Sequence, residues 1–110
     1  MILAFADDST VTAMDDIAEA NTDCEVVDVE NGVYTFLNEY GAILRPVFPT
    51  PTRRTLFGVL CSPDSFTLAP TEERRPDLLQ AIFNRKVIVE PGRRIQTSDE
   101  LIRELKQCES

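Results

Sequence analysis

The sequence predicts one α+β domain over residues 1–110, with two or three helices packed on one face of an antiparallel sheet of four to six strands. Short apolar and β-branched segments alternate with turn residues along the first two thirds of the chain, a pattern typical of hairpins and meanders. The last third changes to apolar residues three and four positions apart, the period of an amphipathic helix. A chain of 110 residues has room for a single core.

The first segment predicts a strand over residues 2–5 followed by a helix that ends near Asn21. The expected helix carries an apolar stripe at helical spacing: Val11, Met14, Ile17 and Ala18. Three hydroxyl side chains are candidates to cap its first turn: Ser9, Thr10 and Thr12. Thr12 and Asp15 also have the spacing of a capping box.

The next segment predicts two hairpins in succession. Strands over 24–29 and 33–37 flank Asn31-Gly32, and Asn-Gly between β-branched and aromatic residues is the strongest short hairpin signal. A second turn over 38–41 leads into a strand over 42–48. Pro46 has no N–H to donate to a ladder, so this third strand is expected to be an edge strand or to end there.

The middle of the chain predicts a connection and another hairpin. Residues 49–54 are polar and contain two prolines, which indicates a loop. Apolar runs over 56–61 and 65–68 flank Ser62-Pro63-Asp64, so they are expected to add one or two strands to the sheet.

The last third predicts a helix over about 76–84, a short strand over 86–90 and a final helix. Pro76 suits a first helical turn, and Pro91-Gly92 ends the strand. Thr97 with Glu100 forms a capping box for the final helix. The apolar stripes are Leu78, Leu79, Ile82 and Phe83 in the first of these helices, and Leu101, Ile102, Leu105 and Cys108 in the second.

The composition argues against catalysis. The chain has no histidine, so the commonest general base and the usual metal ligand are missing. Its four glycines stand apart and form no phosphate loop. The three cysteines lie far apart, which indicates reduced, packed thiols. We therefore predict a protein that is not an enzyme, with no cofactor and no bound metal.

One alternative comes from Asp7-Asp8, which follows an apolar strand. Over about 32 residues this start resembles a response-regulator receiver domain, in which acidic residues after the first strand hold magnesium. The receiver pattern also needs an aspartate after a third strand and a lysine after a fifth, whereas residues 33–48 indicate a hairpin and the lysines are only Lys86 and Lys106. The resemblance implies a metal-binding signalling domain.

Residues 5–8, Phe-Ala-Asp-Asp, also resemble the acidic tetrapeptide of reverse transcriptases, in which two aspartates bind catalytic metal. The other palm residues of that family would lie upstream, where this chain has four residues. A simpler interpretation of Asp7 and Asp8 is that they place favourable charge and capping groups at a helix N-terminus.

The charge is distributed unevenly along the chain. The first 44 residues carry ten acidic and no basic side chains, and the other 66 carry nine acidic and eleven basic ones, for a net charge of −8. Basic doublets could neutralise the acidic half within one molecule: Arg53-Arg54, Arg74-Arg75, Arg85-Lys86 and Arg93-Arg94. Otherwise the acidic half attracts a basic partner. The predicted contact residues are Asp7, Asp8, Asp15, Asp16, Glu19 and Asp23.

These observations predict a non-enzymatic protein-binding domain, such as an immunity protein or small inhibitor of a toxin or nuclease, with a basic protein partner. A self-associating structural domain, in which acidic and basic halves of two copies meet, is a further alternative. The net negative charge opposes nucleic-acid binding. The absence of a long apolar run and of a basic leader predicts no membrane contact and a cytoplasmic location.

Overall fold

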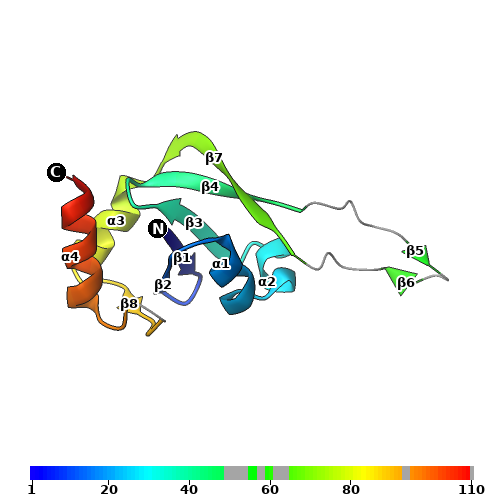
Figure 1. Cartoon of the computed structure of the whole chain (residues 1–110), viewed down its shortest axis with the longest axis horizontal. Helices are drawn as coiled ribbons and strands as arrows, with labels where there is room; N and C mark the ends of the chain where they lie inside the picture. The colour runs from blue at the N-terminus through cyan, green and yellow to red at the C-terminus, as the bar shows by residue number, and fades with distance from the viewer. Residues whose placement is uncertain (49–54, 57–58, 61–64, 93–94, 110) are drawn as a thin grey trace.

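The computed structural model describes residues 1–48, 55–56, 59–60, 65–92 and 95–109. Within these residues a six-stranded sheet has the order β7-β4-β3-β1-β2-β8, and four helices pack against it (Figure 1). Neighbouring strands are antiparallel except β2 and β8, which are parallel. The elements are β1 (Ile2–Ala6), β2 (Thr10–Met14), α1 (Ile17–Asp23), α2 (Val26–Glu30), β3 (Tyr34–Asn38), β4 (Ala42–Val47), β5 (Thr55–Leu56), β6 (Val59–Leu60), β7 (Thr67–Arg74), α3 (Pro76–Phe83), β8 (Ile88–Val89) and α4 (Ser98–Glu109).

The α+β class is confirmed, but the helices cover both faces of the sheet. Leu3 and Phe5 of β1 point to one face, where they pack with residues of α3 and α4. Ala4, between them, points to the other face and packs with Ala20 of α1 and Val29 of α2. Because successive side chains of a strand alternate, the uniformly apolar β1 needs a cover on each side. The expectation of helices on one face is therefore wrong.

Residues 10–14 form β2 and not the start of a helix. β2 pairs with β1 from Ile2 opposite Met14 to Phe5 opposite Val11. The turn between them is Asp7-Asp8-Ser9, in which Ser9 has φ 68° and its N–H donates to the carbonyl of Ala6 over 3.3 Å. A turn followed by a left-handed residue is a common hairpin connection, and it explains why the polar cluster joins two strands.

The first helix begins at Ile17, and its N-cap is Asp16. The Asp16 Oδ1 accepts the backbone N–H of Glu19 over 2.9 Å, so this aspartate satisfies one of the free donors of the first turn. The predicted caps at residues 9, 10 and 12, and the box with Asp15, are therefore wrong. The helix ends at Asp23, two residues after the predicted end.

The predicted strand over residues 24–29 is wrong, because Val26–Glu30 form α2. Asn31 is the C-cap, and Gly32 has φ 75°. The Gly32 N–H donates to the Val29 carbonyl over 3.2 Å, and the Val33 N–H donates to the Asp28 carbonyl over 3.1 Å. Asn-Gly thus supplies a left-handed helix end, which needs the same positive φ as a hairpin turn. The strand predicted after it is confirmed as β3.

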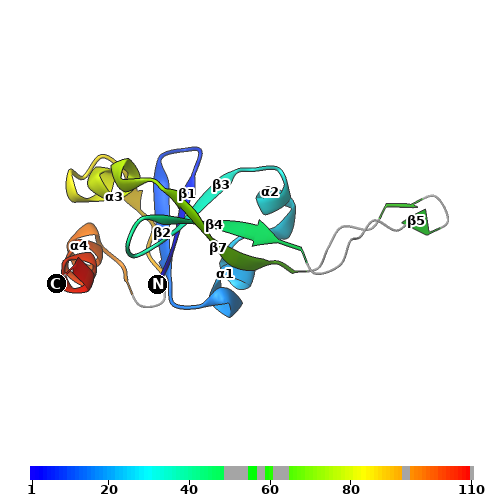
Figure 2. The ribbon, with the colours of Figure 1, turned by 90° about the horizontal axis from the view of Figure 1, so that it is seen from above.

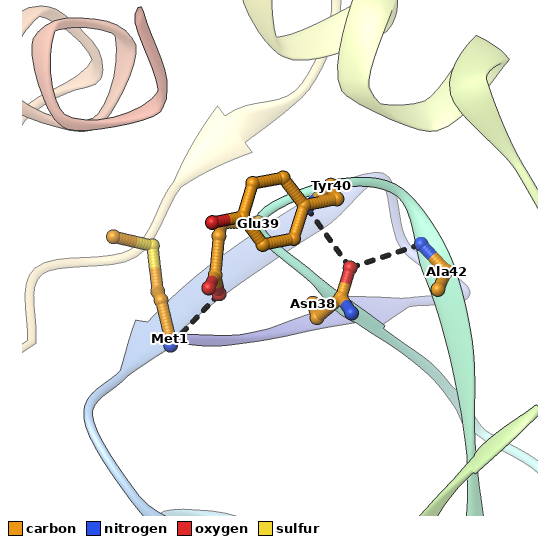
Figure 3. Close-up of polar contacts among 5 residues, drawn as sticks. All are labelled: Met1, Asn38, Glu39, Tyr40 and Ala42. Atoms are coloured by element: carbon orange, nitrogen blue, oxygen red, sulfur yellow. Dashed lines mark hydrogen bonds and ion pairs between the residues drawn. The ribbon is translucent and has the colours of Figure 1, made fainter. Parts of the chain in front are cut away.

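The predicted turn between β3 and β4 is confirmed, and Asn38 organises it. The Asn38 Oδ1 accepts the backbone N–H of Tyr40 over 2.9 Å and that of Ala42 over 3.0 Å (Figure 3). The ammonium of Met1 donates to the Glu39 Oε2 over 2.9 Å beside this turn (Figure 3). Burial alone would raise the pKa of Glu39, but the hydrogen bond from the ammonium, a backbone hydrogen bond and the ammonium charge together outweigh it, so the pKa is lowered.

β4 lies inside the sheet, between β3 and β7. Its described pairing with β3 is limited to Leu44 and Ile43, opposite Phe36 and Leu37. Pro46 lies further along β4 and pairs with Leu68 of β7. The proline is thus at a stretch paired on one side only, one residue before the strand ends at Val47. Of the two expectations, an edge strand is wrong, and an end near Pro46 is confirmed.

The predicted loop over 49–54 and the turn at 62–64 lie outside the described residues. Leu56 of β5 pairs with Val59 of β6, so the run predicted as one strand contains a small antiparallel pair (Figure 1). Residues 67 and 68, from the run predicted as its hairpin partner, begin β7 and pair with β4.

The C-terminal predictions are confirmed for the described residues, and the side chain of Cys108 from the predicted stripe lies outside them. α3 has Pro76 in its first turn and buries Ile82, and β8 lies within the predicted strand. The Thr97 Oγ1 accepts the backbone N–H of Glu100 over 3.2 Å at the start of α4, which buries Leu101 and Leu105. Asp99 of α4 pairs with Arg85, which lies two residues after the end of α3.

Candidate functional site

The six predicted contact residues separate into two groups in the structure. Asp7 and Asp8 lie in the turn at one end of β2, and Asp15 and Asp16 follow its other end. A strand of five residues spans roughly 14 to 17 Å, so these pairs are well separated. α1 then brings Asp23 to the cavity beside the first pair. Glu19 remains in the first turn of α1 with the second pair.

A cavity of about 620 Å³ lies at the Asp7-Asp8 turn. It is open to solvent and is lined by four separate stretches of the chain: the β1–β2 hairpin, the end of α1, the start of β3 and the residues after β8. The lining residues are Ala6, Asp7, Asp8, Thr10, Thr12, Thr22, Asp23, Val33, Tyr34, Glu90, Pro91 and Gly92. We call this space the acidic cavity.

The pleat of the sheet explains which strand residues reach the acidic cavity. Val11 and Ala13 of β2 point to the α3–α4 side, so Thr10 and Thr12 point to the α1–α2 side. In the same way, Ala6 is opposite Tyr34 in the β1–β3 register and both line the cavity. The cavity therefore occupies the α1–α2 face of the sheet, where the chain leaves α1.

The charged side chains that line the acidic cavity are all carboxylates: Asp7, Asp8, Asp23 and Glu90. Each of these residues is exposed, so solvent screens their mutual repulsion. The Thr10 hydroxyl donates to the Asp8 Oδ1 over 2.6 Å and fixes one of them. Among the lining residues that the structure describes there is no arginine or lysine, so this part of the cavity is complementary to a positively charged group.

Tyr34 belongs to this lining, Cys24 is buried beside it, and both remain uncharged at neutral pH. Burial, followed by the charges of Asp23 and Asp28, raises the pKa of the Cys24 thiol to about 11, although a hydrogen bond with Tyr34 opposes this. Burial and the neighbouring Cys24 raise the pKa of the Tyr34 phenol. A buried thiol with a raised pKa is a poor nucleophile. This pair therefore supports packing and not covalent chemistry.

The second group, Asp15, Asp16 and Glu19, has a structural role as well as a negative charge. Asp16 caps α1 as described above, and it is exposed, as is Asp15. Glu19 is half-buried. Because the negative charge of Asp16 lies at the positive end of the helix dipole, it stabilises α1 while remaining accessible to a partner.

The receiver-like alternative is not reflected in the fold of the first 32 residues. A receiver start would require a strand, a helix and a second strand, whereas this chain has two strands followed by two helices. Among the described residues, no three histidine, cysteine, aspartate or glutamate side chains form a group that could hold a metal ion. In the same part of the chain, no helix has the length and apolar character required to cross a membrane.

Sequence reasoning missed the contributions of Thr10, Thr12, Tyr34 and Glu90 to the acidic cavity. The β-branched residues Thr10, Val11 and Thr12 are a signal for the strand β2. The spacing of Val11, Met14, Ile17 and Ala18 favours a helix instead and led to the wrong prediction. Glu90 had no local signal, because its position depends on the parallel pairing of β8 with β2. The Glu90 N–H donates to the Val11 carbonyl over 2.9 Å and holds this segment at the cavity.

No protein-family model matches this chain, and neither does any curated protein or solved structure.

Proposed function

We propose that this chain is a non-enzymatic protein-binding domain whose acidic N-terminal surface engages a basic protein partner. Such a surface suits an immunity protein or small inhibitor that covers the basic surface of a toxin or nuclease. The acidic surface is Asp7, Asp8, Asp15, Asp16, Glu19 and Asp23. These residues border the acidic cavity or lie in and just before the first turn of α1.

The observation that carries the proposal is where the ion pairs lie. In the described part of the chain, Glu39 pairs with the terminal ammonium of Met1, while Arg75 pairs with Asp77 and Arg85 with Asp99. None of these three ion pairs includes a residue of the acidic surface, in which Asp15 has a further interaction of its own. Arg75 and Arg85 thus neutralise carboxylates that lie outside the acidic surface.

An acidic surface of this kind favours association with a basic protein for two physical reasons. Its field raises the encounter rate with an oppositely charged surface. Its carboxylates also repel one another in the free protein, so a partner that supplies positive charge relieves that repulsion on binding. Both effects weaken with added salt, because the Debye length falls from about 10 Å at 0.1 M to about 3 Å at 1 M.

The test is affinity capture from a lysate of the source organism at low salt, followed by elution with a salt step and identification by mass spectrometry. The affinity of the purified partner is then measured by calorimetry. We expect the charge reversal Glu19→Lys/Asp23→Lys to weaken binding at least about tenfold, which corresponds to roughly 1.4 kcal/mol.

The matched control is Glu72→Lys/Glu73→Lys, which makes the same change in net charge on exposed residues of β7. This variant is expected to bind almost as well as the wild type. Equal weakening by both double variants would mean that only net charge matters. Undiminished binding by the Glu19 and Asp23 variant would overturn the proposal.

A further inference from the structure

We propose that the outer edge of β8 pairs in antiparallel orientation with β8 of a second copy of this chain, so that two sheets join into one. β8 is an end strand, with β2 on one side and, among the described residues, no strand on the other. The Ile88 side chain is 68% exposed, more than any other large hydrophobic side chain in the described part of the chain. An exposed β-branched residue on an open edge is suited to the addition of a strand.

The backbone of β8 has hydrogen-bonding groups that point away from β2. The N–H of Ile88 donates to the Ser9 carbonyl over 3.0 Å. Two residues further on, the N–H of Glu90 donates to the Val11 carbonyl over 2.9 Å. Because backbone groups alternate in direction along a strand, the N–H and carbonyl of Val89 point to the outer edge. A strand of a second copy can bond to these groups.

Residues 86–90 are complementary to a second copy of themselves. Their sequence is Lys-Val-Ile-Val-Glu, with opposite charges at the two ends and Ile88 at the centre. β8 itself is Ile88–Val89, so the pairing extends the strand at both ends. Antiparallel pairing centred on Ile88 puts Lys86 of each copy opposite Glu90 of the other, and both side chains are exposed. Opposite charges in such cross-strand pairs stabilise a sheet, and like charges destabilise it.

The directions of the backbone and of the side chains agree with this register. It places Val87 of each copy opposite Val89 of the other, and these are the residues whose backbone groups point outward. The two Ile88 residues then form a non-hydrogen-bonded pair, in which Cα atoms approach to about 4.5 Å and side chains lie closest. Val87 and Val89 pack against the core on the α3–α4 face, so Ile88 points to the other face. There the two isoleucines would cover each other.

The other end strand of the sheet, β7, is a contrast. It contains Pro70, which has no N–H, followed by Glu72 and Glu73, and all three residues are exposed. Proline and charged residues are typical of an edge that is protected against pairing. The β8 edge has an apolar residue at its centre and opposite charges around it. β8 is therefore the edge suited to pairing with its own copy.

The test is sedimentation equilibrium of the full chain from micromolar to millimolar concentration. A short edge buries little area, so we expect a weak monomer–dimer equilibrium. Ile88→Lys should weaken the dimer at least about tenfold, because it places two like charges opposite each other. The matched control Val27→Lys makes the same change at an exposed residue of α2 and should leave the dimer unchanged. A wild type that stays monomeric, or equal dimerisation of the wild type and Ile88→Lys, would overturn the proposal, as would equal weakening by Val27→Lys.

A charge exchange tests the register. Lys86→Glu and Glu90→Lys should each weaken the dimer at least about threefold, because each places like charges opposite each other. The double variant Lys86→Glu/Glu90→Lys should restore it. The controls Lys106→Glu and Glu72→Lys make the same changes in net charge on exposed residues elsewhere and should leave the dimer unchanged. A double variant that dimerises no better than the single variants would contradict the antiparallel register.

Hydrogen exchange locates the interface directly. The amide of Val89 should exchange more slowly as the protein concentration rises, because it gains a partner only in the dimer. The amide of Ile88 already donates to Ser9 and should change less. A dimer in which the exchange of Val89 does not depend on concentration would exclude β8 as the interface. Ile88 is outside the acidic surface, so dimerisation through β8 and binding of a basic partner are tested separately.

Discussion

The two faces of the sheet are covered by helices of different kinds. α3 and α4, with 8 and 12 residues, cover one face through regular apolar stripes. α1 and α2, with 7 and 5 residues, cover the other face and bury only Ala20 and Val29 among their own residues. Helices this short have marginal stability in isolation, so caps and tertiary contacts determine whether they form. The spacing of apolar residues therefore predicts the helices on the α3–α4 face correctly and those on the α1–α2 face wrongly.

The difference also positions the candidate site. A pair of short helices leaves part of its side of the sheet to other residues, and the acidic cavity forms there over Thr10, Thr12 and Tyr34. Figure 2 shows α3 and α4 together at one end of the molecule and α1 and α2 near the strands β4 and β7. The longer helices serve the core, whereas the shorter ones serve both the core and the surface available to a partner.

The largest expected effect tests whether the α1–α2 face is a true core. Phe66 is 1% exposed, and its ring centroid lies 5.6 Å from that of Phe36 and 6.5 Å from that of Phe48. Phe66→Ala should lower the free energy of unfolding by about 3–5 kcal/mol, as Leu101→Ala on the other face should by about 2–5 kcal/mol. Urea unfolding measures both. A loss below about 1 kcal/mol for Phe66→Ala would show that this face contributes little.

The next prediction concerns the bond between α1 and the start of β7. The Asn21 side chain donates to the Phe66 carbonyl and accepts the Phe66 N–H, both over 2.9 Å. Asn21→Ala leaves these partly buried groups unpaired and should cost about 1–3 kcal/mol. Thr22→Ala, on the exposed side of the same turn, should cost less than about 0.5 kcal/mol. Equal losses in thermal or urea unfolding would mean that Asn21 acts only through helix propensity.

An alkaline pH dependence should belong to the α1–α2 face. The pKa of Cys24 is raised from 9.0 to about 11, so between these values the unfolded chain loses the thiol proton while the folded chain keeps it. Stability therefore falls as pH rises through this window, by up to about 3 kcal/mol. Cys24→Ala should lack this part of the loss in urea unfolding at several pH values. Parallel curves for the two proteins would contradict it.

An acidic pH dependence should come from the ion pair beside the other face. The lowered pKa of Glu39 means that its contribution is complete above the ordinary value of 4.5 and is lost as pH falls through the lowered pKa. Glu39→Gln should reduce stability by about 1 kcal/mol at neutral pH, and the difference from wild type should shrink in acid. A difference that stays constant from neutral pH into acid would exclude the charge of Glu39 as its cause.

The smallest effect compares the ends of one helix from each face. Gly32 after α2 has φ 75°, and Arg85 after α3 has φ 57°. A side chain at position 32 would meet no atom within 4 Å, so the effect there is conformational. Glycine should be more stable than alanine at both positions by about 1 kcal/mol, in Gly32→Ala and in Arg85→Gly against Arg85→Ala. Alanine equal to glycine at either position would exclude left-handed strain there.

The sequence predicted the long elements and missed those that depend on tertiary context. The capping box at Thr97 and the proline at residue 76 are local signals, and both are confirmed. The run Val26-Val27-Asp28-Val29 has strand propensity, but packing of Val29 and the cap at Gly32 determine a helix. Val11 and Met14 fit a helical stripe as well as a strand, and the pairing with β1 decides between them.

The candidate site was predicted only in part for the same reason. Asp7, Asp8 and Asp23 were identified from the uneven charge, and they do line one cavity. Charge counting could not show that Asp15, Asp16 and Glu19 lie away from the cavity. Their separation from Asp7 and Asp8 follows from the direction of β2. Tyr34 and Glu90 were missed because their positions depend on strand pairing and carry no signal in sequence spacing.

The Asn21–Phe66 contact has a consequence for the order of folding. It joins residues 45 positions apart, whereas the β1–β2 hairpin joins residues 12 or fewer apart. Distant contacts pay a larger loop-closure entropy and form later than local ones. We expect the α1–α2 face to assemble after the hairpin, as should the parallel pairing of β2 with β8, which joins Thr10 to Ile88. A partner would then bind a face that is completed late, and its binding should slow hydrogen exchange there.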